Sequence, residues 1–335
     1  MSKREFAFSL GGVWWVNEKG EHMNKYFVFG DVHGEYYALA EALNEAGYDG
    51  TNPKHILVSL GDNFDRGPLS IDVYRLLTEN ARNICIKGNH ETFLEEALEK
   101  GIDGEFVFFN ILHNGLYETI QSFAYAQNKD AVTTAQIQAY IDKINERFPD
   151  LLHWLKKMPL YFETKNYFFC HAGVDPNTYP TLPDEHFMLW DIQYSHVPIR
   201  TFDKKTFVIG HHHASKVREN AEKAGYATTT PNIPWVGCID ENKPVKIGNK
   251  IAIDPCSNLT HRINILVIED EPKETETKRE ETTEPENSIR ITNNGDAVYT
   301  INYGQTNFTY RPNGVIIDPT VAYGAYTATD HEIFR

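Results

Sequence analysis

Five short motifs in this sequence combine glycine with aspartate, asparagine or histidine, and each follows a short apolar run. They occupy residues 30–34 (GDVHG), 61–67 (GDNFDRG), 88–91 (GNHE), 171–173 (HAG) and 210–213 (GHHH). A single aspartate after a strand is usually a helix N-cap, so each motif alone is a weak signal. Together they supply carboxylate, amide and imidazole groups, which are ligands of first-row divalent metals. The set therefore predicts a site for two metal ions.

The motifs need a scaffold that brings them together, and the rest of the chain indicates one. Short apolar runs that we expect to be strands alternate with helical patterns at residues 35–46, 70–78 and 92–100. The expected strands are residues 26–29, 55–60, 83–86, 160–162, 167–170, 207–209, 250–253 and 263–267. This repetition is typical of an α/β domain with a central sheet. Polar residues at the strand ends of such a sheet collect along one edge, where sites are usually built.

Residues 101–158 interrupt this alternation with a helix-forming, aromatic-rich sequence. The aromatic residues include Phe106, Phe108, Phe109, Tyr117 and Phe123. We interpret the segment as a helical insertion that lies over the sheet edge. Most of its aromatic side chains are expected in a core, and the remainder are expected to shape a substrate groove.

The sharpest change of composition lies between residues 269 and 286. This stretch holds nine acidic and three basic residues, with two prolines. Segments of this kind repel themselves and stay disordered, so we expect an acidic linker at residues 269–287. It divides a large domain at residues 1–268 from a small β-rich module at residues 288–335. Asn-Gly dipeptides and alternating apolar residues in that module favour a hairpin or a small sheet.

The five motifs, in this order, resemble those of the calcineurin-like metallophosphoesterases. The GDNFDRG form of the second motif narrows the resemblance to the phosphoprotein phosphatase superfamily, and there to the bacterial and bacteriophage branch of serine/threonine phosphatases. The resemblance covers roughly residues 25–268. It implies that residues 1–268 are a catalytic domain of α/β class, a metallophosphoesterase-type β-sandwich flanked by helices. The helical insertion and the small C-terminal β appendage are additions to that fold.

The resemblance implies a metal-binding role for six residues. Two of them bind the first metal, one bridges both metals and three bind the second; in that order they are Asp31 and His33, Asp62, and Asn89, His171 and His211. Amide and imidazole ligands are neutral, which leaves the cluster positively charged toward an incoming phosphate. The resemblance favours two divalent ions, Mn²⁺ first, with iron, zinc or nickel as alternatives.

The same resemblance implies catalytic roles for residues near the metals. His90 points at the substrate and protonates the leaving oxygen, while Asp65 orients His90 and favours its charged form. Arg66 grips the phosphate through its fork geometry, and Asn89 also faces the substrate. The alternatives are a surface salt bridge for Arg66 and a structural cap for Asp65.

Two departures from the family pattern concern substrate binding. The second phosphate-gripping arginine of the superfamily, expected near Trp190-Asp191, has no clear counterpart, and Arg200 is the candidate for it. Two more histidines follow His211, where the family has a small residue. We favour His213 as an additional substrate-binding group, because it lies two residues on and so on the same side of a strand or turn. The alternative is that one of the two histidines hydrogen-bonds to the sheet.

The implied reaction is hydrolysis of a phosphomonoester by direct attack of a metal-bridging hydroxide, with His90 as general acid. Phosphoserine and phosphothreonine are the favoured substrates. The alternatives within the superfamily are a dinucleoside tetraphosphatase and a phosphodiesterase that acts on RNA ends or cyclic nucleotides. An alternative of another class is a non-catalytic phosphate-binding interaction protein. Such a protein is expected to lack a ligand or His90, and the sequence retains all of them.

Composition bounds the partners and the compartment. The 335 residues include 32 Lys and Arg against 47 Asp and Glu, a formal charge of −15, so strong nucleic-acid binding is not expected. Four widely spaced cysteines without a CxxC pair favour a reducing compartment, and no apolar run approaches about 18 residues. We expect a cytoplasmic enzyme that acts on a phosphorylated protein or a small phosphoester away from membranes. The C-terminal module is expected to bind a partner.

Overall fold

Strand β3 (Asn24–Phe29) shows why the central part of this molecule is covered on both sides. Phe27 and Phe29 pack into one hydrophobic cluster, whereas Tyr26 and Val28 pack into another. Successive side chains of a strand point to opposite faces, so the two clusters lie on opposite faces of the sheet. All four side chains are buried, as is typical of strands with parallel neighbours and a cover on each face.

The computed structural model describes residues 23–126, 133–176, 179, 184–199 and 204–272, and the backbone of six further strands. The chain divides into two units, Met1–Lys273 and Glu274–Arg335. Arg200 lies outside the described residues, and so does most of the expected acidic linker. Among the described residues, no helix combines the length and the apolar character needed to cross a membrane.

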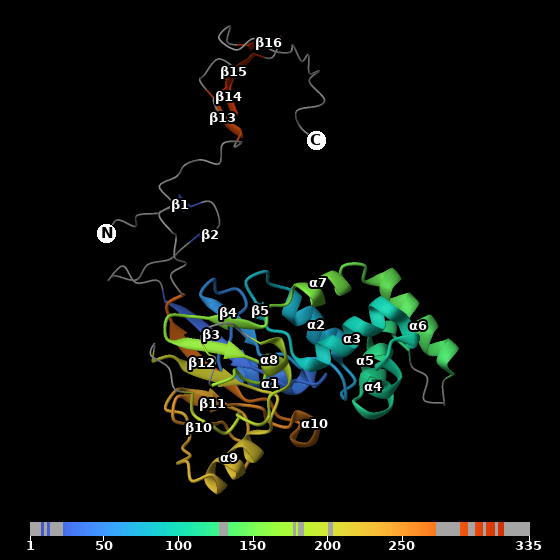
Figure 1. Ribbon diagram of the computed structural model, residues 1–335, viewed down its shortest axis with the longest axis vertical. Coiled ribbons are helices and arrows are strands. Elements are labelled where there is room, and N and C mark those ends of the chain that lie inside the picture. Colours follow the sequence, from blue (N-terminus) through green and yellow to red (C-terminus); the bar gives the residue numbers. More distant parts are fainter. Residues whose placement is uncertain are drawn as a thin grey trace. The chain divides into compact units, whose positions relative to one another are not determined.

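The first unit contains two five-stranded sheets (Figure 1). The first sheet consists, in spatial order, of β5 (Ile84–Cys85), β4 (His55–Ser59), β3, β12 (Ile265–Asp270) and β9 (Trp235–Val236). The second consists of β10 (Val245–Ile247), β11 (Lys250–Ala252), β8 (Thr206–Ile209), β7 (Tyr167–Cys170) and β6 (Tyr161–Glu163). Strands β3, β4 and β5 are parallel, as are β7, β8 and β11, while the other strands pair antiparallel.

The two sheets pack face to face and helices cover both outer faces. Tyr26, Val58 and Leu266 of the first sheet share one core with Phe169 and Val208 of the second. The helices over the first sheet include α1 (Tyr36–Glu45), α2 (Ser70–Thr78) and α3 (Asn89–Lys100). Those over the second sheet are α8 (Glu185–Trp190) and α9 (Ala214–Lys223), and the short α10 (Ser257–Thr260) precedes β12. This architecture confirms the expected β-sandwich flanked by helices.

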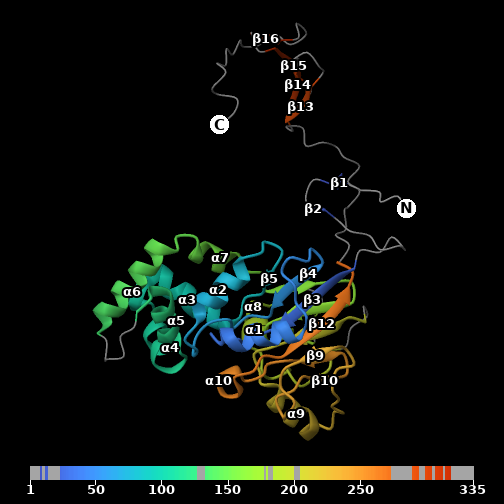
Figure 2. The same ribbon diagram turned by 180° about the vertical axis from the view of Figure 1, so that it is seen from behind.

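The segment between α3 and β6 is helical. After a 3-10 turn (Gly101–Asp103) it forms α4 (Val107–His113), α5 (Leu116–Ala124), α6 (Thr134–Arg147) and α7 (Leu151–Lys157). Helix α6 begins at a capping box in which Thr133 and Gln136 exchange hydrogen bonds between side chain and backbone. Helices α4 to α6 gather at one end of the unit and α9 lies at the other, as the views from both sides show (Figures 1 and 2).

Strand β12 extends into the stretch that we expected to be linker. Asp270 is buried at its end and accepts hydrogen bonds from Thr164 Oγ1 (2.6 Å) and from the backbone N–H of Asn166 (2.8 Å). Glu269 and Asp270 therefore belong to the sheet and not to a linker. The expectation was wrong for these two residues because composition does not reveal that one acid of the run is paired inside the fold.

Six further short strands are described by their backbone alone. Four of them form an antiparallel meander in the second unit: β13 (Ile289–Asn293), β14 (Tyr299–Tyr303), β15 (Thr306–Arg311) and β16 (Gly314–Ile317). Two near the N-terminus, β1 (Phe8–Ser9) and β2 (Gly12–Val13), pair antiparallel with each other.

Candidate active site

Loops that follow five strands converge where the two sheets meet. Asp31 follows β3, Asp62 follows β4 and Asn89 follows β5 in the first sheet, while His171 follows β7 and His211 follows β8 in the second. The structure brings Asp62, Asn89, His171 and His211 into one group and His33, Asp62 and His90 into another. Asp31 is tied to them by the hydrogen bond that it accepts from the backbone of His211, and its role as a ligand stays a prediction. The parallel strands explain this convergence, because their carboxyl ends lie at the same edge of each sheet.

The backbone at the site is held in an unfavourable conformation. Asp31, His33, Asp62 and His211 have φ angles of 55°, 46°, 53° and 62°, in the left-handed region that favours glycine. Each such residue costs on the order of 1 kcal/mol or more, and the surrounding structure must impose it. The turn that follows each strand is thereby sharp enough to direct these side chains toward one another.

One group of ligand atoms lies around His171. Its Nδ1 donates to the backbone oxygen of Leu60 (2.8 Å), so its Nε2 carries a lone pair. That Nε2 lies 3.0 Å from Asn89 Oδ1, 3.2 Å from His211 Nδ1 and 3.3 Å from Asp62 Oδ1. With its amide turned the other way, Asn89 would donate to both imidazoles and to Asp62. In either orientation the ligand atoms of Asp62, His171 and His211 lie within 4.8 Å of one another. A divalent cation satisfies such a cluster, and the donor types suit a first-row metal.

A second group of ligand atoms lies around His33. Its Nδ1 donates to the backbone oxygen of Phe64 (2.9 Å), and its Nε2 lies 3.8 Å from Asp62 Oδ2. Asp31 Oδ2 is buried and has no hydrogen-bond partner among the described residues, while Oδ1 accepts from the backbone N–H of His211 (2.8 Å). Burial, then the nearby charges of Asp254 and Asp62, raises the pKa of Asp31 well above its ordinary value. A cation would satisfy this orphaned oxygen, so the residues fit a second metal.

His90 lies beside both groups. Its Nδ1 donates to Asp65 Oδ2 (2.7 Å), and its Nε2 lies 3.9 Å from Asp62 Oδ2. Burial lowers the pKa of His90, but the carboxylates of Asp62 and Asp65 outweigh burial and raise it overall. The guanidinium group of Arg66 contacts the imidazole rings of both His90 and His33. Its Nη2 donates to His90 Nε2 (3.1 Å), and its Nη1 donates to His33 Nε2 (2.9 Å). The three residues expected in catalysis are therefore in mutual contact.

Comparison with known proteins decides the family. The model of the family described as "Calcineurin-like phosphoesterase" matches residues 25–235, which is more than half of the chain. The chain is a calcineurin-like phosphoesterase. This confirms the resemblance seen in the motifs, and it supports the expectation of a phosphoric ester hydrolase at the level of the family.

Curated relatives of the phosphoesterase carry two kinds of name. "Serine/threonine-protein phosphatase 2" of Escherichia coli is 44% identical over 24% of this chain and 35% of its own length. The protein of that name from Salmonella typhimurium is 29% identical over 55% of this chain and 78% of its own length. "Bis(5'-nucleosyl)-tetraphosphatase, symmetrical" of Coxiella burnetii is 30% identical over 45% of this chain and 42% of its own length. The phosphoesterase thus spans about a third of the first of these relatives.

Glu91 holds the loops of the phosphoesterase site together. Its carboxylate accepts hydrogen bonds from the backbone N–H groups of Asp62, Asn63 and Gly88, each at 2.8 Å. The bond to Gly88 closes the N-terminal turn of α3, so Glu91 caps the helix and supports the site. Burial, then the charge of Asp62, raises the pKa of Glu91 to about 7.

Three residues outside the five motifs also support the site. Asp254 is buried and lies close enough to Asp31 to raise its pKa. Ser257 Oγ donates to the backbone oxygen of Asp31 (2.5 Å), and Thr119 of α5 contacts Asp65. Asp254 lies two residues after the end of β11, and a polar residue after a strand is the same signal that marked the five motifs. Ser257 and Thr119 had no such signal, because they reach the site only through tertiary contacts.

The two histidines after His211 lie in different surroundings. His213 is the N-cap residue of α9, and it is not among the grouped metal ligands of the described residues. It lies near Asp254, whose pKa is raised by burial, an effect that the charge of His213 opposes. His212 Nδ1 is hydrogen-bonded to Ser195 Oγ (2.8 Å), so His212 is the one that supports the fold. A substrate-binding role for His213 remains a prediction. The same holds for Arg200, which lies outside the described residues.

Proposed function

We propose that this phosphoesterase is a binuclear metal-dependent phosphatase that hydrolyses phosphomonoesters, first of all phosphoserine and phosphothreonine in proteins. The arrangement of His90 carries the proposal. Its ring is oriented by Asp65 on one side and faces Arg66 and the shared carboxylate of Asp62 on the other. A proton donor, a phosphate-binding fork and a metal-bridging carboxylate thus meet at one point.

We assign one metal to Asp31, His33 and Asp62, and the other to Asp62, Asn89, His171 and His211. When bound, the two divalent ions supply positive charge for the phosphoryl oxygens and make a water molecule acidic enough to act as the nucleophile. Asp62 suits the bridging position because its two oxygens face different groups, Oδ1 toward His171 and Oδ2 toward His33.

The protein side chains do the rest of the work in this proposal. Asp65 accepts a hydrogen bond from His90 Nδ1, and the carboxylates of Asp62 and Asp65 together raise the pKa of the ring against the effect of burial. In the structure His90 Nε2 accepts a hydrogen bond from Arg66, so it takes up its proton for the leaving oxygen when a phosphate draws Arg66 away. Arg66 contacts His90 and His33 through both of its terminal nitrogens. An arriving phosphate would accept these two donors as a bidentate pair, which frees His90 Nε2 to face the leaving group.

The substrate class is the finer part of the proposal. The names of the Escherichia coli and Salmonella typhimurium relatives support a phosphoprotein substrate. The name of the Coxiella burnetii relative supports the alternative, a dinucleoside tetraphosphate. Manganese as the native metal and a cytoplasmic location are also parts of this proposal.

A side-by-side assay of the full chain tests the function. With Mn²⁺ present, we expect hydrolysis of p-nitrophenyl phosphate and of a phosphothreonine peptide to exceed that of a dinucleoside tetraphosphate and a cyclic nucleotide. His90→Ala should lower kcat by about 10²- to 10⁴-fold while the metal content stays unchanged. His153→Ala, at an exposed position of α7, is the matched control. Equal rates for His90→Ala and the wild type would remove His90 as the acid, and turnover of the tetraphosphate alone would favour the alternative.

A further inference from the structure

Helix α5 of the insertion presents two hydroxyl groups to the start of α2 and to the loop before it. Thr119 and Ser122 are three residues apart and therefore lie on one face of the helix. Thr119 Oγ1 accepts from the backbone N–H of Asp65 (2.7 Å), and Ser122 Oγ accepts from that of Ile71 (3.1 Å). Neither Thr119 nor Ser122 belongs to the five motifs, so the insertion contacts the catalytic loop through residues of its own.

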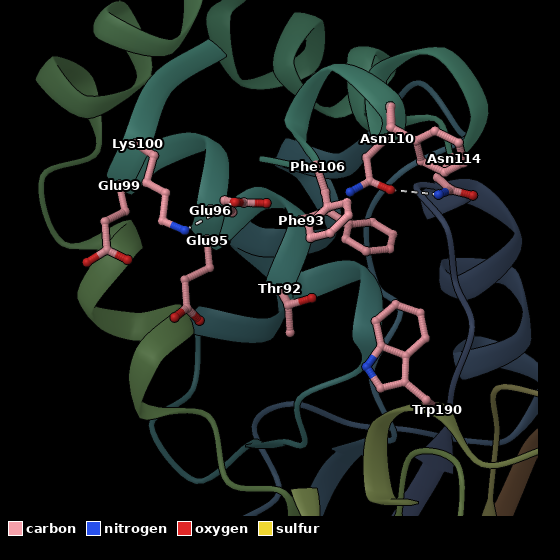
Figure 3. Close-up of a pocket in the computed structure, with 11 residues that line it drawn as sticks. Thr92, Phe93, Glu95, Glu96, Glu99, Lys100, Phe106, Asn110, Asn114 and Trp190 are labelled. Carbon is pink, nitrogen blue, oxygen red and sulfur yellow. Dashed lines mark hydrogen bonds and ion pairs between the residues drawn. The ribbon is translucent and has the colours of Figure 1, made fainter. Parts of the chain in front are cut away.

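The start of α5 is also held in place. Gly115 is its N-cap residue, and the oxygen of Gly115 accepts from the backbone N–H of Arg66 (3.1 Å). Just before it, Asn114 Nδ2 donates to Asn110 Oδ1 of α4 (2.7 Å), and a dashed line marks this bond in Figure 3. Asn110 is buried. The position of Thr119 is therefore set by contacts at the beginning of its helix and along its face.

The hydroxyl of Thr119 uses its full hydrogen-bonding capacity. A hydroxyl donates one hydrogen bond and accepts two. Thr119 Oγ1 lies 2.7 Å from the backbone nitrogen of Asp65, 2.7 Å from Asp65 Oδ1 and 3.2 Å from Ser70 Oγ. A backbone N–H only donates and an ionised carboxylate only accepts, so the Thr119 proton goes to Asp65 Oδ1. Ser70 is then the donor of the third bond.

The directions of these bonds extend to His90. Asp65 accepts from Thr119 at Oδ1 and from His90 Nδ1 at Oδ2, each at 2.7 Å. Thr119 and Asp65 are fully buried, so bulk water does not compete for these bonds. A carboxylate that is fixed at one oxygen keeps the other turned toward the ring. Nδ1 of His90 therefore keeps its proton, and Nε2 is the nitrogen that exchanges a proton with the site.

We propose that Thr119 is a positioning residue for the general acid. It acts through Asp65, whose fixed carboxylate keeps His90 Nε2 directed at the leaving oxygen. When the P–O bond to the leaving group breaks, its electron pair stays on that oxygen and the proton of Nε2 joins it, while water supplies the new oxygen on phosphorus. This inference rests on the proposed phosphatase function and adds to it a residue from the insertion.

The basicity of the leaving group provides a readout that is specific for the acid. p-Nitrophenolate is a weak base and departs readily without a proton, whereas phenolate is a stronger base and needs one. A poorly positioned acid therefore slows phenyl phosphate more than p-nitrophenyl phosphate. A partly unfolded enzyme slows both esters by the same factor. The ratio of the two kcat values separates these two causes.

Removal of the hydroxyl tests the proposal in the full chain with Mn²⁺. Thr119→Val replaces the hydroxyl with a methyl group. We expect kcat for phenyl phosphate to fall by about 10- to 100-fold and kcat for p-nitrophenyl phosphate by less than about threefold, with KM and metal content unchanged. Thr119→Ser keeps the hydroxyl and should restore both rates to within about threefold of the wild type. Thr119→Ala, which adds no atoms, takes the place of the valine variant if that protein does not fold.

A matched control and a double variant complete the experiment. Ser122→Ala removes the neighbouring bond of the same interface without touching Asp65, and it should leave the ratio of kcat values unchanged. His90→Ala should change the ratio in the same direction as Thr119→Val and more strongly. Thr119→Val added to His90→Ala should have little further effect on phenyl phosphate, because the group that Thr119 positions is gone.

The outcomes separate the two levels of proposal. If the wild type hydrolyses neither ester, the proposed function fails. If His90→Ala slows both esters by one factor, His90 is not the acid and the role of Thr119 falls with it. If His90→Ala shows the leaving-group effect but Thr119→Val does not, or if Ser122→Ala shows it equally, the function stands and the positioning role of Thr119 is overturned.

Discussion

Asp62 connects every part of the active site. Its Oδ1 lies 3.3 Å from His171 Nε2, and its Oδ2 lies 3.8 Å from His33 Nε2 and 3.9 Å from His90 Nε2. Burial alone would raise the pKa of Asp62, but the imidazoles around it, His171 first, hold the pKa below its ordinary value. The side chain is therefore a buried anion whose charge serves both ligand groups.

Substitution of this anion by its neutral amide should affect both metals. We expect Asp62→Asn to lower the metal content of the purified protein from two ions to one or fewer, because the shared charge is lost to both groups. Elemental analysis after equilibration with Mn²⁺ measures this directly. Asp72→Asn on α2, at a partly exposed side chain, should keep the wild-type content. Two ions retained by Asp62→Asn would contradict the bridging role.

A buried lysine lies close to the site without taking part in it. Lys250 is 1% exposed, and its Nζ donates to the backbone oxygen of Tyr194 (2.6 Å). Burial lowers its pKa from 10.5 to about 8, although the nearby Asp191 opposes the shift. The bond ties the segment that follows Trp190 to strand β11.

The lowered pKa of Lys250 predicts how stability depends on pH. Between pH 8 and about 10 the unfolded chain keeps this proton while the folded protein releases it, so the free energy of unfolding rises with pH. The slope reaches at most about 1.4 kcal/mol per pH unit from this group, and no slope is expected below pH 8. Urea unfolding at several pH values should show this contribution in the wild type and lose it in Lys250→Met. Lys246→Met on β10 is the control, and equal slopes in all three proteins would refute the assignment.

At the level of elements, helix α5 of the insertion holds the catalytic loop. Thr119 Oγ1 accepts from the backbone N–H of Asp65 and lies 2.7 Å from its Oδ1, to which it donates. The backbone N–H of Arg66 donates to the oxygen of Gly115 (3.1 Å). Asp65 and Arg66 have φ angles of 70° and 67°, so these contacts help to hold a conformation that the loop alone would disfavour.

Gly115 provides a test of this support. A Cβ at Gly115 would lie 2.2 Å from the backbone nitrogen of Arg66, and its φ of 82° is itself unfavourable for alanine. Gly47 has a φ of 75° but open space around its Cα. We expect Gly47→Ala to lower the free energy of unfolding by about 1 kcal/mol without affecting turnover. Gly115→Ala should lower stability further and also reduce kcat at least several-fold. Unchanged kcat in a folded Gly115→Ala protein would show that α5 does not position Arg66.

The elements themselves were largely readable from the sequence. The helix predicted at residues 70–78 is α2 as observed, and the apolar runs became strands because both sheet faces are covered. Helix α3 begins at Asn89, earlier than the prediction at residue 92. The reason is that Glu91 caps the helix through Gly88, so Asn89 and His90 lie in its first turn. Their polar side chains had instead indicated a loop.

For the molecule as a whole, the position of the candidate metal ligands at strand ends was predictable, whereas the residues that support them were not. Asp31, Asp62 and His171 follow strands in short motifs, so local sequence places them. Thr119 reaches Asp65 across more than 50 residues of chain, through a contact that only the fold creates. In the acidic run after residue 268, local composition was misleading. It predicted a disordered linker, whereas Asp270 is a buried acceptor for Thr164 and Asn166.

This boundary yields a prediction about truncation. A chain that ends after Lys273 contains the whole first unit, so its turnover of p-nitrophenyl phosphate should match that of the full chain. A chain that ends after Val267 lacks Asp270 and leaves the donors of Thr164 and Asn166 unpaired, which should lower the free energy of unfolding by at least about 2 kcal/mol. Asp270→Asn in the full chain separates the lost acceptor from the lost strand residues. An inactive but folded chain of residues 1–273 would mean that the second unit completes the active site, and the assignment of catalysis to the first unit alone would fall.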